Sequence, residues 1–318
     1  MRIQLHQLIL AYPPISNQEA EWLKNDREVQ KQLQNSNLYF IGQKPESTYE
    51  FEYNVQTKIE NQRVVCFFVR TGSKRSSASI DIDDLLDFYG LQHECELEIE
   101  LGPKLIRFWR VDNARKDIID WFTTDKLLFD KWRKKDFIHG FDDYREFSVY
   151  QLHYVGISKK ENSLKRLVVK PHDKRLRILS NEHPLSIGSR VTDEMVLFFF
   201  EIDSLEIKQF IEEQDFSEIG FNELEDKIKI VADAEKAFVK IMDTQYNEVK
   251  FKQYPFSDDG LYNSKVNRYS FSINEDLTFI SSDNVIKGER GTLNEFSNSD
   301  FISINVESKE VELVKNEN

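Results

Sequence analysis

The sequence predicts an α+β fold, in which helices and strands occupy different stretches of the chain. Residues 94–101 alternate between polar and apolar side chains, as in a strand with one face in water. Residues 191–202 form the most hydrophobic segment and are typical of a central strand that is buried on both faces. Residues 232–243 instead place their apolar side chains at helical spacing.

The length of 318 residues is enough for two domains with separate cores. We expect an N-terminal α+β domain over residues 1–140, which would select a target or bind a protein partner. A second domain would cover residues 141–255, with the boundary near Gly140. Residues 256–318 are β-rich and would form a C-terminal extension.

In the N-terminal part, residues 1–11 are expected to form a strand. Ser16 and Glu19 have the spacing of a capping box and predict a helix start. Several β-like stretches follow within residues 49–111. Residues 112–135 carry a long helical pattern that ends in cations, so we expect a helix there.

In the C-terminal half, residues 204–226 are acidic and are expected to be helical. The tail beyond Tyr254 predicts further strands, with a turn at Gly288–Gly291.

Composition excludes several classes of protein. Cys66 and Cys95 are the only cysteines and form no CxxC pair, so a zinc site or a disulfide framework is not expected, and a reducing cytoplasm is the default location. No apolar run reaches the roughly 18–20 residues that cross a membrane. The carboxylates near residues 81–87 are better explained by a helix N-terminus than by a metal site.

One stretch reverses the sign of the charge. The chain has a net charge of -13, yet residues 149–177 are strongly basic after a β-rich start that breaks at Gly156. Such a cationic segment suits a phosphate or another polyanion. Its candidate nucleic-acid-binding residues are Lys159, Lys160, Lys165, Lys170, Lys174, Arg175 and Arg177.

Two separate segments carry the candidate chemistry. Tyr-Val-Gly at residues 154–156 is followed ten residues later by Arg166, and then by His172. Further on, a helix bearing Glu235 is followed twelve residues later by Asn247. This combination resembles the GIY-YIG nuclease superfamily, in which a strand with Tyr-Ile-Gly leads to a helix with an arginine, and a later helix supplies a metal-binding glutamate.

The resemblance covers roughly residues 141–250 and departs from the family pattern in two respects. Thr244-Gln245 replaces the usual proline before Tyr246-Asn247. No Gly-Ile-Tyr triplet precedes Tyr154 at the spacing of the family. Tyr150 and Tyr144 are the candidates for the missing tyrosine, and Tyr150 is close in sequence while Tyr144 has a polar setting. Leu38–Gly42 looks similar to the Tyr-Val-Gly segment but lacks a cationic helix behind it.

The resemblance implies a domain with a small central antiparallel sheet that hydrolyses phosphodiester bonds. Glu235 would hold one Mg²⁺ or Mn²⁺ ion. Tyr154 would accept the proton of the attacking water, with a pKa depressed by cations, and Arg166 would neutralise charge on the phosphate. His172 would contact phosphate or act as an acid, while Gly156 and Asn247 would give structural support.

The implied substrate is nucleic acid, with DNA ahead of RNA, and a role in restriction or anti-phage defence follows by analogy. The alternative is an inactive nuclease-fold protein that acts as a nucleic-acid-binding or protein-interaction subunit. The acidic composition and the missing triplet favour that alternative.

Overall fold

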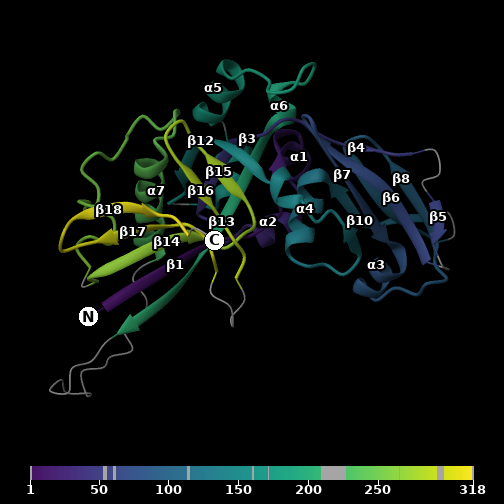
Figure 1. The fold of residues 1–318 in the computed structure, drawn as a ribbon, viewed down its shortest axis with the longest axis horizontal. Helices are drawn as coiled ribbons and strands as arrows, with labels where there is room; N and C mark the ends of the chain where they lie inside the picture. The colour runs from purple at the N-terminus through teal and green to yellow at the C-terminus, as the bar shows by residue number, and fades with distance from the viewer. Residues whose placement is uncertain are drawn as a thin grey trace.

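The computed structural model has an α+β fold, as the sequence predicts (Figure 1). The structure describes residues 2–52, 56–59, 62–112, 115–159, 161–170, 172–208, 227–264, 266–291 and 297–316. The predicted helix at 204–226 lies mostly outside these residues, and its first part, up to Lys208, is strand.

A ten-stranded sheet forms the larger part of the molecule, in the order β16-β15-β12-β3-β13-β1-β14-β17-β18 with β2 beside β13 (Figure 1). Its strands are β1 (Arg2–Leu10), β2 (Ile15–Ser16), β3 (Leu38–Gln43), β12 (Val149–Ile157), β13 (Met195–Lys208), β14 (Arg268–Ile273), β15 (Thr278–Ile280), β16 (Val285–Lys287), β17 (Phe301–Asn305) and β18 (Glu310–Val314). The predicted tail strands therefore complete this sheet and do not form a separate layer.

Strand β3 lies at the centre of the sheet, and all six of its residues are buried. It pairs in antiparallel fashion with β12 on one side and with β13 on the other. The apolar start of β13 is buried from Met195 to Phe200, which confirms the predicted strand from Met195 onward, whereas residues 191–194 of the predicted strand are helical. Three antiparallel strands that are distant in sequence thus form the middle of the fold.

The segment between β3 and β12 forms two smaller sheets on the opposite side of the molecule from α7 (Lys227–Met242) (Figure 1). One sheet contains β4 (Ser47–Glu50), β5 (Gln56–Ile59), β6 (Gln62–Thr71), β7 (Lys74–Asp81) and β11 (Ile138–Gly140), and the other contains β8 (Glu96–Leu101), β9 (Leu105–Asp112) and β10 (Arg115–Thr123). We call this stretch, residues 44–148, the inserted segment. It also contains α3 (Ile82–Phe88), α4 (Thr124–Trp132) and the short helix η1 (Tyr144–Phe147).

The predicted boundary near residue 140 does not match this arrangement. Strands β1 and β3 belong to the proposed N-terminal domain, yet they pair with β12, β13 and β14 of the later chain. The N-terminal residues supply the centre of the large sheet, and the inserted segment begins only after Gln43. Strands β1 and β3 are apolar enough to need a neighbouring strand on both edges. Local sequence patterns do not identify which strands these neighbours are.

The helix predicted over 112–135 is also wrong in its first half. Residues 115–123 form β10, which pairs with β9, and only α4 is helical. Ile118, Trp121 and Phe122 suit both a helix and a strand, so pairing with a neighbouring strand decides between them.

Helices cover the two faces of the large sheet. Helix α7 (Lys227–Met242) packs on one face, where Phe238 contacts Phe40 of β3 with ring centroids 5.1 Å apart. The other face carries α1 (Asn17–Leu23), α2 (Arg27–Gln32), η2 (Lys165–Val169), α5 (Asp173–Asn181) and α6 (Val191–Glu194). The predicted capping box at Ser16 and Glu19 is present at the start of α1.

Candidate active site

Tyr39 of β3 and Tyr154 of β12 lie side by side on the face that carries η2 and α5. Their ring centroids are 6.2 Å apart, and β3 pairs with β12 so that Tyr39 lies opposite Gly156. Tyr39 belongs to the Leu38–Gly42 stretch, which looks similar to the Tyr-Val-Gly segment but has no cationic helix behind it. The tyrosine that faces Tyr154 therefore comes from the strand before the inserted segment.

A β-bulge places Tyr154 on this face. The register between β12 and β3 shifts between Leu152 and Tyr154, at His153. Because side chains alternate along a strand, Tyr154 would otherwise lie on the same face as Leu152. The imidazole of His153 is buried and lies 2.9 Å from the side-chain oxygen of Gln43, so the extra residue is held in place.

Gly156 provides the space that the tyrosines occupy. A Cβ atom at this position would lie 2.7 Å from Cζ of Tyr39 and 2.6 Å from Cε1 of Tyr154. Carbon atoms do not approach this closely without displacement, so no other residue fits while both rings stay in place. Gly156 continues β12 instead of forming the predicted break, since the strand ends at Ile157.

His172 links the two tyrosines to α5. Its Nδ1 accepts a hydrogen bond from the Arg175 backbone N–H and caps the helix, with a nitrogen–nitrogen distance of 3.2 Å. Because Nδ1 is the acceptor, the proton of the neutral ring is on Nε2, which lies 3.0 Å from Oη of Tyr39 and donates to it. The Tyr39 hydroxyl in turn donates to Tyr154. The three side chains form one hydrogen-bond chain.

The histidine is neutral in this setting. Burial lowers the pKa of His172 to about 4, and the charges of Arg166 and Arg175 act in the same direction. The imidazole is also buried beneath the tyrosines. It is therefore positioned to orient Tyr39, and its burial leaves little room for the phosphate contact or acid role that the resemblance implies.

The expectation of a depressed tyrosine pKa is not met in the free chain. Burial raises the pKa of Tyr154, and the carboxylate of Glu235 adds to this rise. The hydrogen bond from Tyr39 and the charge of Arg166 oppose it. Tyr154 is half-buried, whereas Tyr39 is 1% exposed, so only Tyr154 can meet a substrate.

Arg166 lies on η2, a short helix with π-type hydrogen bonding in which the Lys170 N–H bonds to the Lys165 carbonyl. Leu167 of the same helix packs into the core below, while Arg166 is exposed. Its guanidinium acts electrostatically on Tyr39, Tyr154 and His172. Within the described residues no ion pair neutralises it, so its charge is available to an anion.

Glu235 lies on α7 and is half-buried. Burial raises its pKa to about 7, while Lys236 and Lys159 lower it and Asp259 raises it. The carboxylate acts electrostatically on both Tyr39 and Tyr154. None of the residues that the structure describes donates a hydrogen bond to it or forms an ion pair with it. A desolvated carboxylate without a partner is a suitable ligand for a cation.

Asn247 fastens the segment after α7 to β12. Its Oδ1 accepts from the Val155 N–H at 3.0 Å, and its Nδ2 donates to the Val155 carbonyl at 2.8 Å. Thr244 donates to the same Oδ1 at 2.7 Å. The Asn247 side chain thus bonds to the edge of β12 as a neighbouring strand would, directly beside Gly156. Asn247 therefore supports β12 as well as the end of the helix.

The predicted nucleic-acid-binding residues fall into different groups. Lys165 is exposed, whereas Lys170 pairs with Glu161, Lys159 pairs with Asp259, and both Lys174 and Arg177 pair with Glu248. Arg175 is partly buried and bonds to Asn17 and to the Leu167 carbonyl, so it holds the fold together. Lys160 lies outside the described residues.

The structure does not place Tyr150 or Tyr144 in the site. Tyr150 is fully buried on the face toward α7, and its hydroxyl donates to Asp125 at 2.8 Å. Its ring packs on Phe198 with centroids 4.8 Å apart. Tyr144 donates to Asp276 at 2.6 Å. Both tyrosines are structural, and Tyr39 is the residue that sequence reasoning missed.

A second group of possible metal ligands, Asp81, Asp84 and His139, lies on the inserted segment. Asp81 accepts hydrogen bonds from the backbone N–H groups of Asp83 and Asp84, which confirms that it marks the start of α3. Asp84 and His139 are exposed. The helix-capping role accounts for Asp81, so the group needs no ion to explain it.

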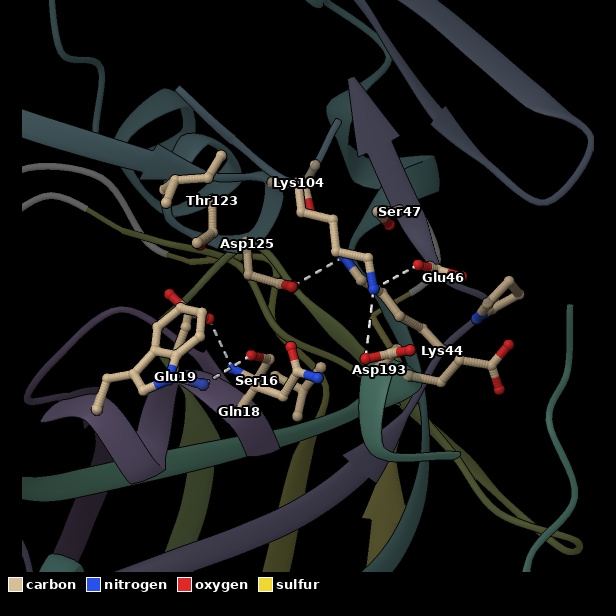
Figure 2. Close-up of a pocket in the computed structure, with 16 residues that line it drawn as sticks. Ser16, Gln18, Glu19, Lys44, Glu46, Ser47, Lys104, Thr123, Asp125 and Asp193 are labelled. Atoms are coloured by element: carbon tan, nitrogen blue, oxygen red, sulfur yellow. Dashed lines mark hydrogen bonds and ion pairs between the residues drawn. The ribbon is translucent and has the colours of Figure 1, made fainter. Parts of the chain in front are cut away.

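A hollow lies where the inserted segment meets the large sheet (Figure 2). Lys44 Nζ is 2.7 Å from Asp125 Oδ1, and Lys104 Nζ is 2.6 Å from Glu46 and 3.3 Å from Asp193. These charged side chains neutralise one another. We therefore interpret the hollow as a junction between two parts of the chain.

No family model, curated protein or solved structure matches the chain. Among the described residues, no helix combines the length and the apolar character that crossing a membrane requires.

Proposed function

We propose that the chain is a divalent-metal-dependent endonuclease that hydrolyses phosphodiester bonds, and that it resembles GIY-YIG nucleases with DNA as the first substrate to test. One observation carries the proposal: Tyr39, Tyr154 and His172 are in contact with one another, and the charges of Arg166 and Glu235 act on both tyrosines. Tyr39 of β3, which lies beside Tyr154, would take the place of the tyrosine that the sequence lacks before Tyr154.

Each side chain has a role that its surroundings support. Tyr154 is the accessible phenol at the end of the hydrogen-bond chain, so it would accept a proton from the attacking water. Its phenolate would be stabilised by the hydrogen bond from Tyr39 and by the charge of Arg166. Arg166 is exposed and unpaired among the described residues, so it would neutralise charge that develops on the phosphate.

Glu235 would hold one Mg²⁺ or Mn²⁺ ion. The fit rests on an oxygen ligand whose carboxylate is desolvated and lacks a partner within the described chain. A single carboxylate suits a hard cation that keeps several of its waters. When bound, the ion would stabilise negative charge on the phosphate oxygens. The positive charge would also offset the effect of Glu235 on Tyr154, so the pKa of the phenol would fall.

A second candidate function is an inactive nuclease-fold protein that binds nucleic acid or a protein. The ion pairs of Lys170, Lys174 and Arg177 with nearby glutamates favour the protein-binding form of this alternative, because these cations are already paired and less available to phosphates. It predicts binding without metal-dependent cleavage.

A plasmid-nicking assay with Mg²⁺ or Mn²⁺ distinguishes the two candidates. Wild-type protein should convert supercoiled plasmid to open circles, and EDTA should prevent this. Glu235→Gln should remove cleavage, whereas Glu201→Gln, a half-buried glutamate of β13, should retain it. Cleavage that survives Glu235→Gln would reject the site. Absence of cleavage in wild-type protein on DNA and on RNA would favour the binding function.

A further inference from the structure

Asp259 is an acidic residue beside the proposed active site to which the mechanism assigns no role. Its Oδ1 lies 2.7 Å from Lys236 Nζ, and its Oδ2 lies 2.8 Å from Lys159 Nζ. Both lysines and Asp259 itself act electrostatically on Glu235. One carboxylate therefore holds two cations next to the proposed metal ligand.

The two lysines differ in their freedom to move. Lys236 is 7% exposed and also donates to the Ala232 carbonyl of its own helix at 3.1 Å. A buried ammonium needs a counter-ion, so this pair is expected to persist. The Lys159 side chain is 52% exposed and follows the end of β12. Since it uses the other carboxylate oxygen, Lys159 can leave without exposing Lys236.

Asp259 is fixed in its position by the segment around it. The buried carboxylate of Asp233 accepts from the Leu261 N–H at 3.0 Å and from the Tyr254 hydroxyl at 2.6 Å. At Gly260 a Cβ atom would collide with the same carboxylate, so the backbone is packed directly against it. The backbone at Asp259 is therefore held in place, and its carboxylate stays paired with Lys236 if Lys159 turns toward another anion.

We propose that Asp259 occupies the position of a substrate phosphate beside Lys159, and that Lys159 transfers from Asp259 to a backbone phosphate when nucleic acid binds. This inference rests on the proposed function and names a residue that sets substrate affinity. Asp259 lowers the affinity in two ways: it competes for Lys159, and its own charge repels the polyanion. The exchange is reversible because an exposed ion pair is weak.

The test measures the binding of a short fluorescein-labelled DNA duplex by anisotropy, in EDTA so that no cleavage occurs. Asp259→Asn should bind about two- to fivefold more tightly than wild-type protein. Asp243→Asn is the matched control, because that side chain is also 53% exposed and pairs with Lys250 at 3.0 Å. The gain should disappear in Asp259→Asn combined with Lys159→Met. Equal affinity of the Asp259→Asn and Asp243→Asn variants would overturn the inference.

A second variant covers the case in which Asp259→Asn fails to fold because Lys236 loses its counter-ion. Lys159→Met leaves the Asp259–Lys236 pair intact. It should bind more weakly, and the slope of log affinity against log salt should become shallower by about one. An unchanged slope would overturn the inference.

The binding experiment on Asp259 and the plasmid-nicking assay can fail independently of each other. A protein that cuts DNA without the affinity gain keeps the nuclease function and loses this inference. A protein that shows the gain without metal-dependent cleavage keeps the inference and loses the nuclease function.

Discussion

The phenol of Tyr39 lies over Gly156, although the whole inserted segment separates the two residues in the chain. The pairing of β3 with β12 brings them opposite each other, and a Cβ at Gly156 would lie 2.8 Å from the Tyr39 hydroxyl oxygen. The contact shows why a glycine follows Tyr154 and Val155 at this point. The positions of both tyrosine rings therefore depend on the absence of a Cβ atom at residue 156.

Gly156→Ala should therefore displace both tyrosines. We expect a loss of about 1–3 kcal/mol of unfolding free energy from overpacking, together with loss of cleavage, measured by urea denaturation and plasmid nicking. Gly42→Ala is the control on β3, since a Cβ there would lie no closer than 3.2 Å to its neighbours. A Gly156→Ala protein with wild-type stability and cleavage would contradict the described packing.

Tyr39→Phe tests the hydrogen bond between the tyrosines without changing the ring. Removal of the hydroxyl should slow cleavage by about a hundredfold, because Tyr154 loses the donor that stabilises its phenolate. The control is Tyr150→Phe, whose hydroxyl bonds to Asp125 in the core. That variant should lose about 1–3 kcal/mol of stability and keep its cleavage rate per folded molecule. Equal rates for the two variants would show that Tyr39 has no special role.

His172→Asn separates helix capping from the orientation of Tyr39. Asparagine is a good N-cap residue and should keep the start of α5 stable within about 1 kcal/mol. It cannot reproduce the Nε2–H donor at the Tyr39 hydroxyl, so cleavage should fall by about tenfold and its pH optimum should move upward. Cleavage rates measured across pH check this. A variant with an unchanged pH profile would indicate that the histidine only caps the helix.

Glu19 should make stability depend on pH. Burial raises its pKa from 4.5 to about 7, so the folded state disfavours the charged form. The contribution of Glu19 to the free energy of unfolding is therefore fully present below about pH 4.5, where the carboxyl is protonated in both states. This contribution is lost as pH rises through 7. Glu19→Gln keeps a capping-box side chain and should be more stable than wild-type protein by up to about 3 kcal/mol at pH 8, but not at pH 4. Urea denaturation at both pH values measures this difference, and a constant difference would refute the burial argument.

The sequence allowed most of the second half of the fold to be predicted, since β13 begins as a continuous apolar run and α7 and the tail strands have clear periodicity. It also singled out Tyr154, Gly156 and Arg166, which are close in sequence, and Glu235 by its spacing to Asn247. Tyr39 was missed because its partner strand follows the inserted segment, and β-pairing at that distance leaves no trace in local patterns. The bulge at His153, which turns Tyr154 toward Tyr39, is likewise a property of the pairing and not of the residues alone.

The position of the inserted segment also bears on how the protein is made. More than 100 residues separate β3 from β12, and β13 follows later still. At roughly 5–20 residues per second, a ribosome needs about 5–20 s to translate that interval, during which both edges of an apolar strand have no native neighbour. Such an edge is prone to association with other chains. Expression of the protein should therefore benefit from slow synthesis at low temperature or from chaperones that shield nascent strands.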